Sequence, residues 1–464
     1  MQFSSEISLG SRAKIQSRRT KVAVSQSRVT ISTWLEYGFA MFALFILTDA
    51  IFPLLRKEAE VAVDQSQGDP LTQIILGVTY LIACFLLVYR RQVKLLVKDP
   101  WLVALVALCA ISAAWSLDPS VTLRRSAALI GTSLFGVYLA SRFTFSQQLK
   151  ILAGTLGVAA LLSIAFAILA PRYGIMTGEH AGEWRGIYDH KNILGRMMIL
   201  GAMSFLLIAV TNRKQAMVWW SGFGVSVVVL LLSRSMTSVV VLAGLIMALP
   251  FFGMLRWSAL RWRRSFIPPL LVFGGVAVAG LATLLFIEPK YISDIMGLLG
   301  RDKTLTGRTD IWAMVFYMIS RRPWLGYGYG AFWLENGKEA NDIWTEVGWQ
   351  PPHSHNGFLE LCLAVGVVGL ILFLLGLGAG LKRAVRWIQD IELTEAFWPL
   401  TYLAFILFYN LSEPTILKHN SLFWVLYVAT VVSLRNWERQ AKARDAAERP
   451  LRTYTRPAFV GDRH

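Results

Sequence analysis

The sequence predicts an all-α polytopic membrane protein with about twelve transmembrane helices. The chain has 464 residues, of which 55% are hydrophobic and only 16% are charged. That charged fraction is too small to cover the surface of a soluble domain of this size. Apolar runs of roughly 18–22 residues recur between short polar stretches, and this length spans a bilayer as an α-helix. Together these observations place the chain in the membrane.

The apolar runs give the individual helices and divide the chain into segments. We expect helices at about 35–54, 71–89, 101–117, 126–142, 151–170, 193–211, 216–233, 237–254, 267–287, 357–379, 396–412 and 420–434. The chain is expected to begin with a basic cytoplasmic tail (1–34), followed by helices one to nine (35–287), which include a short outer loop (171–192). A long outer loop (288–356), helices ten to twelve (357–434) and a second basic cytoplasmic tail (435–464) complete the predicted organisation.

The basic residues predict the orientation of the helices. The net charge is +17, and Lys and Arg gather at both ends and in alternate short loops. Such residues stay on the cytoplasmic side of membrane proteins, so both termini are expected to be cytoplasmic. The same distribution argues against nucleic acid as a partner. The three cysteines, Cys84, Cys109 and Cys362, lie in apolar runs and are interpreted as packing residues.

The long outer loop, 288–356, predicts an amphipathic helix over 309–322. Ile311, Val315 and Ile319 recur at helical spacing, and Pro323 stops the helix. The loop is rich in Trp, Tyr and Gly, which favours an ordered segment against the membrane surface. We expect this helix to lie in the membrane interface.

The segment His353-Ser354-His355-Asn356-Gly357 stands where the long loop enters the tenth helix. A histidine at this position titrates near neutral pH and can accept a proton from a hydroxyl, although it can equally cap the helix. Gly366 lies roughly 16 Å further along the helix, so it and Gly369 are expected to pack against a neighbour rather than take part in chemistry.

Three arginines on the outer side are candidates for binding an anion. Arg185, Arg301 and Arg308 lie beside predicted helices, where positive-inside statistics disfavour arginine. Guanidinium groups hold phosphate oxygens in a planar, bidentate way. Pairing with lipid headgroups, or with Asp189 or Asp310, is the alternative.

A metal or nucleotide site is less favoured by the sequence. His353 and His355 could ligate a metal together with Asp189 or Glu346, but no third ligand is spaced convincingly. The glycine-rich stretch 326–330 follows no strand and therefore is not a nucleotide-binding loop. We accordingly expect no metal and no cofactor.

Several of these residues resemble motifs of the O-antigen ligases and the related Wzy-type polymerases. The motifs are His355-Asn356 followed after nine residues by Gly366-x-x-Gly369, Arg185 with Asn192, Gly307-Arg308 with Trp312, the turn Pro323…Gly326-x-Gly328, and Ser412-Glu413. Arg185-Gly-x-x-x-His190-Lys191-Asn192 looks most like the exopolysaccharide polymerases of the succinoglycan type.

The resemblance implies a metal-independent, inverting glycosyltransferase of the GT-C type in the bacterial inner membrane, with its active site facing the periplasm. Its donor would be an undecaprenyl-diphosphate-linked oligosaccharide, its surroundings membrane lipids, and chain-length regulator and export proteins would be its partners. Arg185 and Arg308 would hold the diphosphate, and His355 would be the base. The implied substrate contacts are Asn356, Asn192, Lys191, His190 and Arg301.

The favoured function is polymerisation of the repeat units of an exopolysaccharide or surface polysaccharide, because of His190-Lys191-Asn192. Transfer to lipid A-core or another acceptor, as by an O-antigen ligase, is the first alternative. A lipid-linked sugar transporter or flippase is the second, with the ionisable residues Glu36, Asp49, Arg196 and Glu360 as its candidates. The concentration of His and Arg in the outer loops favours an enzyme.

Overall fold

The computed structural model describes residues 31–50, 70–261, 308–391 and 394–453. The chain divides into two compact units, Met1–Ala40 and Met41–His464. The described part of the first unit is the beginning of helix α2 (Ile31–Ile46). All further description concerns the second unit. The predicted helix 267–287 and the part of the long loop that contains Arg301 lie outside the described residues.

Each predicted span that falls among the described residues contains a helix. Besides α2, these are α4 (Pro70–Tyr89), α5 (Pro100–Ile111), α6 (Pro119–Arg142), α7 (Phe145–Leu169), α9 (Lys191–Thr211), α10 (Ala216–Leu232), α11 (Met236–Arg261), α16 (Gly357–Asp390), α17 (Trp398–Tyr409) and α18 (Leu422–Thr453). The described residues form no strand, only an isolated bridge between Ile175 and Trp184. Among the described residues, six helices are long and apolar enough to cross a membrane. The all-helical membrane class is confirmed, and the number twelve stays a prediction.

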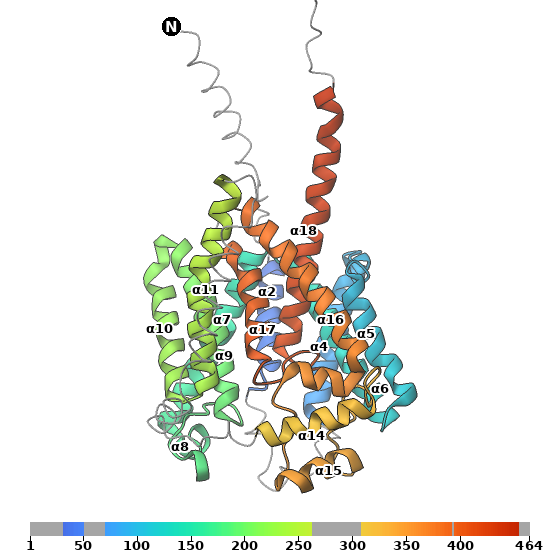
Figure 1. The fold of residues 1–464 in the computed structure, drawn as a ribbon. Helices are drawn as coiled ribbons and strands as arrows, with labels where there is room; N and C mark the ends of the chain where they lie inside the picture. The colour runs from blue at the N-terminus through green and yellow to red at the C-terminus, as the bar shows by residue number, and fades with distance from the viewer. Residues whose placement is uncertain (1–30, 51–69, 262–307, 392–393, 454–464) are drawn as a thin grey trace, which may run out of the picture. The chain divides into compact units, whose positions relative to one another are not determined.

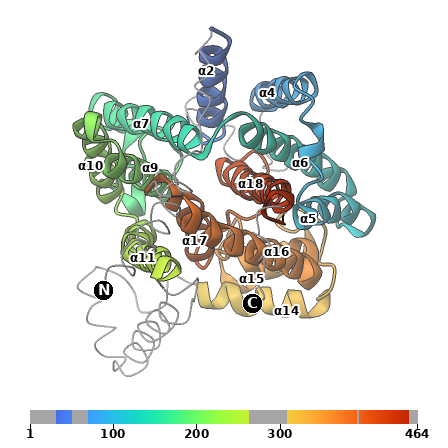
Figure 2. The same ribbon diagram turned by 90° about the horizontal axis from the view of Figure 1, so that it is seen from above.

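Helix α9 is the most enclosed of the candidate spans. In its most apolar window 89% of the residues are buried, against 22% in α4 and 17% in the segment of α10. It packs against α7, α10 and α11 (Figure 2). In a membrane, the apolar side chains that α4 and α10 leave exposed would face lipid, whereas those of α9 face protein.

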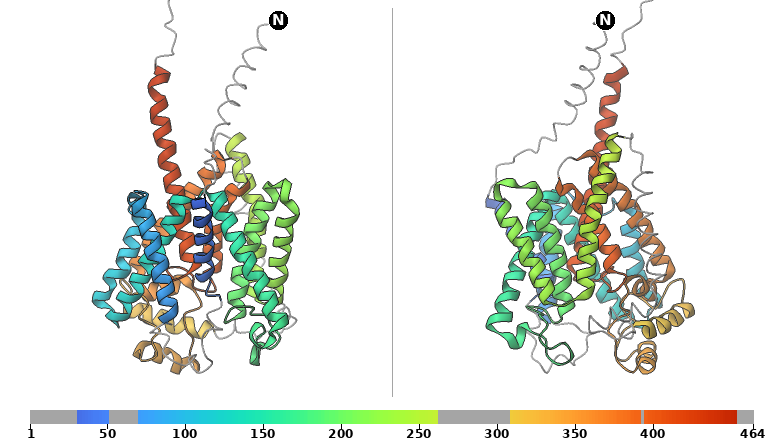
Figure 3. Two further views of the ribbon diagram at one scale, coloured as in Figure 1. Left: turned by 180° about the vertical axis from the view of Figure 1, so that it is seen from behind. Right: turned by 60° about the vertical axis from the view of Figure 1, so that its left-hand side comes forward.

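The amphipathic helix of the long loop is α14 (Arg308–Arg321). Ile311 and Val315 are fully buried as expected, but Met318 completes the buried face and Ile319 is only partly buried beside it. A second helix that the sequence did not predict, α15 (Lys338–Val347), packs against α14. Both helices lie near the first residues of α16 (Figures 1 and 3).

Helix α16 is broken at Val365 and Gly366, and the turn after α14 fills the break. Gly366 has φ +68°, and a Cβ there would lie 2.1 Å from the carbonyl oxygen of Trp324. The amide N–H groups of Tyr327 and Gly328 donate to the carbonyls of Leu363 and Ala364, at 2.8 and 3.0 Å. The groups freed by the break are thus satisfied by another segment. The predicted close approach at Gly366 is real, but its neighbour is a loop rather than a helix.

Helix α18 continues well past the predicted end of the last span at 434. It runs from Leu422 to Thr453 and so takes in most of the segment expected as a tail, 435–464. Its first half is largely buried, whereas Arg439 and Lys442 further along are exposed. A helix can therefore continue past the end of an apolar run, which hydropathy alone does not reveal.

Candidate active site

The loop between α17 and α18 is built around Asn410, which is fully buried. Its Oδ1 accepts hydrogen bonds from the amides of Thr415 and Ile416 at 2.7 and 3.1 Å, and its Nδ2 donates to the carbonyl of Ile406 at 2.8 Å. All its polar atoms are therefore engaged in shaping one turn. That turn holds Glu413, whose side chain is 8% exposed.

The start of α16 fits closely against the same turn. The amide of Gly357 donates to the carbonyl of Asn410 at 2.8 Å, and a Cβ at Gly357 would lie 2.0 Å from Asn410 Oδ1. Only glycine permits this approach. The segment 353–356 that precedes α16 is consequently brought next to Glu413.

Segment 353–356 is itself anchored by α14 and α16. Trp312 Nε1 donates to the carbonyl of Ser354 at 2.9 Å, and the amide of Ser354 donates to Glu360 Oε2 at 3.0 Å. His355 takes the left-handed conformation with φ +51°, which is uncommon for a residue other than glycine. The anchored backbone of Ser354 and the left-handed conformation of His355 together fix the direction of the His355 ring.

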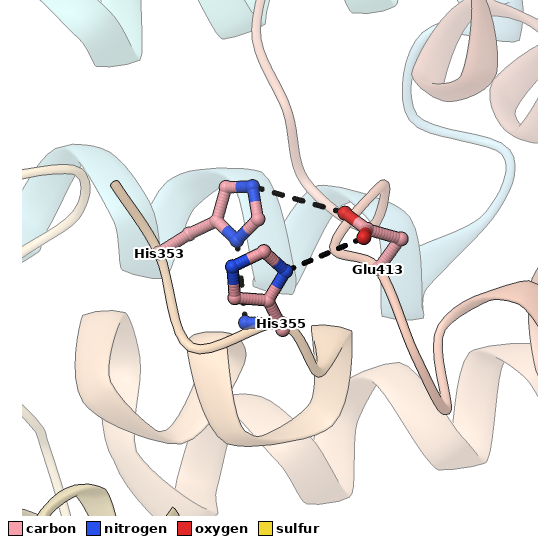
Figure 4. A group of neighbouring side chains, drawn as sticks. All are labelled: His353, His355 and Glu413. Carbon is pink, nitrogen blue, oxygen red and sulfur yellow. Dashed lines mark hydrogen bonds and ion pairs between the residues drawn. The ribbon is translucent and has the colours of Figure 1, made fainter. Parts of the chain in front are cut away.

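Glu413 is the centre of the cluster that results (Figure 4). Its Oε1 lies 3.3 Å from His355 Nδ1 and 3.1 Å from Arg308 Nη2. Its Oε2 lies 3.8 Å from His353 Nε2. Arg308 begins α14, the two histidines precede α16 and Glu413 follows α17, so three separate parts of the chain meet here.

Glu413 is ionised over the whole physiological range. Burial by itself raises the pKa of this carboxyl. The His355 hydrogen bond, the charges that His353 and His355 acquire in acid and the charge of Arg308 outweigh burial and lower the pKa to about 2. The pKa of His353 is lowered, because protein displaces water from its charged form and because His355 repels a second positive charge. A neutral His353 therefore stands beside the carboxylate.

The hydrogen bonds also assign the histidine protons. Ionised Glu413 only accepts, so His355 Nδ1 carries the proton that it shares with Glu413. The remaining nitrogen, His355 Nε2, forms no recorded hydrogen bond with the described residues. An imidazole oriented by a carboxylate, with its second nitrogen available, is the arrangement of a general base.

His353, His355 and Glu413 also have the residue types and proximity of a metal site, since their ligand atoms lie within 4.8 Å of one another. The amide of His355 donates to His353 Nδ1 at 3.2 Å, however, which places the proton of neutral His353 on Nε2. The nitrogen that faces Glu413 is then not free to bind a metal. Arg308 on the same carboxylate further disfavours a cation there.

The outer loop 171–192 has its own network. Arg185 donates from Nε to the carbonyl of Tyr173 at 2.7 Å and from Nη2 to that of Arg172 at 3.2 Å. Lys191 is buried and pairs with Glu183 at 2.5 Å. These recorded contacts of Arg185 and Lys191 stay within the loop and do not join the Glu413 cluster.

The other two predicted residues of this loop lie at the start of α9. His190 Nδ1 accepts from the amide of Asn192 at 3.2 Å, and Asn192 Oδ1 accepts from Ser235 Oγ at 3.0 Å. The pKa of His190 is lowered by burial and by the charges of His180 and Lys191, while the charge of Glu413 acts in the opposite direction. The start of α9 and the Glu413 cluster therefore influence each other electrostatically.

The sequence-predicted site residues are thus distributed as follows. His355 and Arg308 meet on Glu413, whereas Arg185 has its hydrogen bonds elsewhere and Arg301 is not described. Asn356 caps α16, accepting from the amides of Phe358 and Leu359 at 3.0 and 3.1 Å. In the sequence Glu413 stands out only as part of the Ser412-Glu413 motif. Asn410 received no predicted role, and its signal is an Asn at the end of an apolar run just before that motif.

Comparisons with known proteins agree with the resemblance seen in the sequence. Residues 221–374 match a family model described as O-Antigen ligase. The chain is 28% identical over 293 residues to "Exopolysaccharide production protein ExoQ" of Rhizobium meliloti (strain 1021), covering 61% of this chain and 65% of that protein. It is 31% identical over 126 residues to a "Putative polysaccharide ligase" of Rickettsia conorii, covering 26% of this chain and 29% of that protein.

The matches show where in the chain the similarity lies. The family match contains Arg308, His353 and His355 and ends before Glu413. The chain aligns with less than two thirds of the length of each of these relatives. The expected resemblance to O-antigen ligases and exopolysaccharide polymerases is confirmed.

Proposed function

We propose that this chain transfers sugar chains from an undecaprenyl-diphosphate-linked donor and thereby polymerises the repeat units of an exopolysaccharide or surface polysaccharide. The observation that carries the proposal is the His355–Glu413–Arg308 arrangement, in which one carboxylate orients a base and holds a guanidinium beside it. The similarity to an exopolysaccharide production protein supports polymerisation in particular.

In the proposed reaction His355 Nε2 takes the proton of the acceptor hydroxyl as its oxygen attacks the anomeric carbon of the donor. A new glycosidic bond forms, and the bond from that carbon to the diphosphate oxygen breaks. The bonding electrons leave with the diphosphate. Glu413 stabilises the imidazolium that forms, as the carboxylate of a catalytic triad does. Attack opposite the leaving group inverts the anomeric configuration.

The negative charge that builds on the leaving diphosphate requires fixed positive groups. Arg308 is already held at 3.1 Å from Glu413, so its position is set before substrate binds. Arg185 is proposed to bind the same diphosphate from the outer loop, where the ligand would replace the carbonyls of Arg172 and Tyr173 as its partners. His190, Lys191, Asn192, Asn356 and Arg301 are proposed as further donor contacts.

The mechanism is proposed to be independent of metal. Nδ1 of His353 accepts the His355 amide, which leaves Nε2 protonated toward Glu413. The positive charge that a metal would supply comes instead from Arg308. The proposed surroundings are the bacterial inner membrane, with both termini cytoplasmic, the site facing the periplasm, and chain-length regulator and export proteins as partners.

Ligation to lipid A-core or another acceptor is the second candidate, favoured by the similarity to a "Putative polysaccharide ligase". It would use the same donor and the same base and differ only in the acceptor. A flippase is disfavoured because the ionisable groups converge at the beginning of α16, outside the spans. A transporter would instead place such groups along the path that its substrate takes through the membrane.

The test is His355→Asn in purified protein supplied with lipid-linked repeat units. Asparagine tolerates the left-handed backbone at this position and cannot act as a base. We expect kcat to fall about 10²–10⁴-fold with the thermal unfolding midpoint nearly unchanged. His180→Asn, in the outer loop, is the matched control and should retain activity.

The products distinguish the alternatives. Longer lipid-linked chains support the polymerase, transfer only to added lipid A-core supports the ligase, and movement across the bilayer without change of length supports the flippase. Undiminished turnover by His355→Asn would remove the assignment of the base.

A further inference from the structure

Arg196 is a buried arginine that the proposed reaction does not use. It lies in α9 and is 8% exposed, and its Nε is buried without a hydrogen-bond partner. Its guanidinium lies 5.2 Å from the centre of the Phe423 ring. Within the part of the chain that the structure describes, no ion pair is recorded for it. Buried arginines ordinarily have a carboxylate partner, so this donor has unused binding capacity.

The position of Arg196 connects α9 to the loop that carries Glu413. Phe423, beneath its guanidinium, stacks in parallel on Tyr409 with ring centres 6.5 Å apart. Tyr409 accepts the amide of Glu413 at its carbonyl, at 3.0 Å. Arg196 therefore lies beside the residues that hold the active-site loop.

Lys418 is a second cation on that loop. Its side chain is exposed, and the described residues provide it with no recorded ion pair. Its pKa is nonetheless lowered, first because surrounding protein displaces water and then because of the positive charge of Arg196. Because the charge of Arg196 acts on Lys418, the two cations lie near each other.

Three cations, Arg196, Lys418 and Arg308, meet two carboxylates, Glu413 and Asp49, at this place. Glu413 and Asp49 oppose the repulsion between Arg196 and Lys418, but Glu413 is already engaged by Arg308 and His355. Two cations that repel each other at a poorly hydrated place destabilise the protein unless an anion joins them. A ligand that brings oxyanion oxygens would satisfy both.

We propose that Arg196 and Lys418 form an anion-binding subsite beside the Glu413 cluster, which holds an oxyanion carried by the substrate. The inference rests on the proposed function for its substrate. The oxyanion is a phosphate of the lipid diphosphate or a carboxylate on an acidic sugar of the repeat unit. In both cases the charge-assisted hydrogen bonds are of the same kind, with the planar guanidinium offering paired donors.

The experiment measures binding through thermal unfolding of the full chain in lipid nanodiscs, without sugar transfer. Inorganic pyrophosphate represents the first source and glucuronate the second. A ligand that binds only the folded protein raises the unfolding midpoint with its concentration. We expect at least one probe to do so, and Arg196→Gln and Lys418→Met to require at least about tenfold more of it for the same rise.

Lys382→Met is the matched control, since Lys382 is exposed at the far end of α16. It should respond as the parent does. A response to pyrophosphate alone identifies the phosphate as the source, and a response to glucuronate alone identifies the sugar carboxylate. Because Lys418 is exposed, its variant tests the subsite even if Arg196→Gln does not fold.

Three outcomes would overturn the subsite: no response of the parent to either probe, unaltered responses in both variants, or an equal loss in Lys382→Met. A protein that binds pyrophosphate through these residues but transfers no sugar would instead retain the subsite and contradict the proposed function.

Discussion

Helix α16 has a charged cluster at each end, and the two clusters differ in whether they leave an oriented hydrogen-bonding group without a recorded partner. Near its end, Arg383 donates to Asp99 at 2.9 Å and to Glu438 at 3.1 Å. Arg386 and Arg435 also lie on Glu438. At its beginning, Glu413 alone serves Arg308, His353 and His355.

The difference shows what each cluster does. Arg383 and Asp99 are 7% and 3% exposed, and Asp99 also caps α5 by accepting from Leu102, so the far cluster is closed and joins α5, α16 and α18. The Glu413 cluster leaves His355 Nε2 with no recorded partner. Ion pairs that join several helices stabilise a fold, whereas an oriented group without a partner can act on a substrate. The clusters lie about 40 Å apart along α16 at 1.5 Å per residue, so each can be altered separately.

The largest effect is expected at the far cluster. Arg383→Met leaves the buried carboxylate of Asp99 without its cation, which should lower the free energy of unfolding by about 3–5 kcal/mol. The kcat of the folded fraction should not change. Thermal unfolding and turnover at low temperature measure the two quantities, with the exposed neighbour changed in Lys382→Met as control. A large fall in kcat of the folded fraction would show that the two ends of α16 are coupled.

The Glu413 cluster should respond in the opposite way. Glu413→Gln keeps the size of the side chain but removes the charge that orients and stabilises protonated His355. We expect kcat to fall about 10²-fold, which is about 2.7 kcal/mol, in protein that is still folded. Single-turnover kinetics with lipid-linked donor would measure it. If kcat were retained, Glu413 would be a structural ion-pair partner like Glu438, and the contrast between the clusters would disappear.

Acid provides a third test. The pKa of Glu413 is lowered to about 2, below its ordinary value of 4.5, so folding favours the ionised form. The stability that this provides is complete above about pH 4.5 and is lost as the pH falls toward 2. The difference in unfolding midpoint between the parent and Glu413→Gln should be constant from pH 5 to 7 and narrow between pH 4.5 and 3. A difference that widens in acid would show that the carboxyl is protonated in the folded protein.

The helices and part of this site could be predicted from sequence, because they depend on local patterns. Apolar runs locate the spans, Pro323 locates the end of α14, and His355 stands at a recognisable helix entrance. The position of Arg308 in the long loop, expected on the outer side, also predicted an anionic partner. In the structure its recorded partner is Glu413, 105 residues away.

The remainder depends on contacts that no local pattern encodes. Glu413 is 58 residues from His355, and only the turn around Asn410 and the glycine at 357 bring them together. The break in α16 is equally hidden, because Val365 and Gly366 lie within an apolar run and the groups that complete the break come from the 323–328 turn. Hydropathy shows that a segment is apolar. It does not show whether the backbone hydrogen bonds of that segment are made within one helix or with another part of the chain.

The smallest effect we predict separates the anchoring of the site from its chemistry. Trp312→Phe removes the hydrogen bond to the carbonyl of Ser354 and keeps most of the ring's packing. The stability cost should be about 1 kcal/mol. Trp424→Phe, which loses a 2.9 Å hydrogen bond to Ser133 away from the cluster, should cost a similar amount.

Only Trp312→Phe should also lower kcat, and by less than about tenfold, because the amide of Ser354 remains bound to Glu360 and still limits how far His355 can move. Equal kcat in the two variants would mean that Glu360, Glu413 and Gly357 position segment 353–355 without Trp312. Unfolding midpoints and kcat measured side by side decide between one anchor and two.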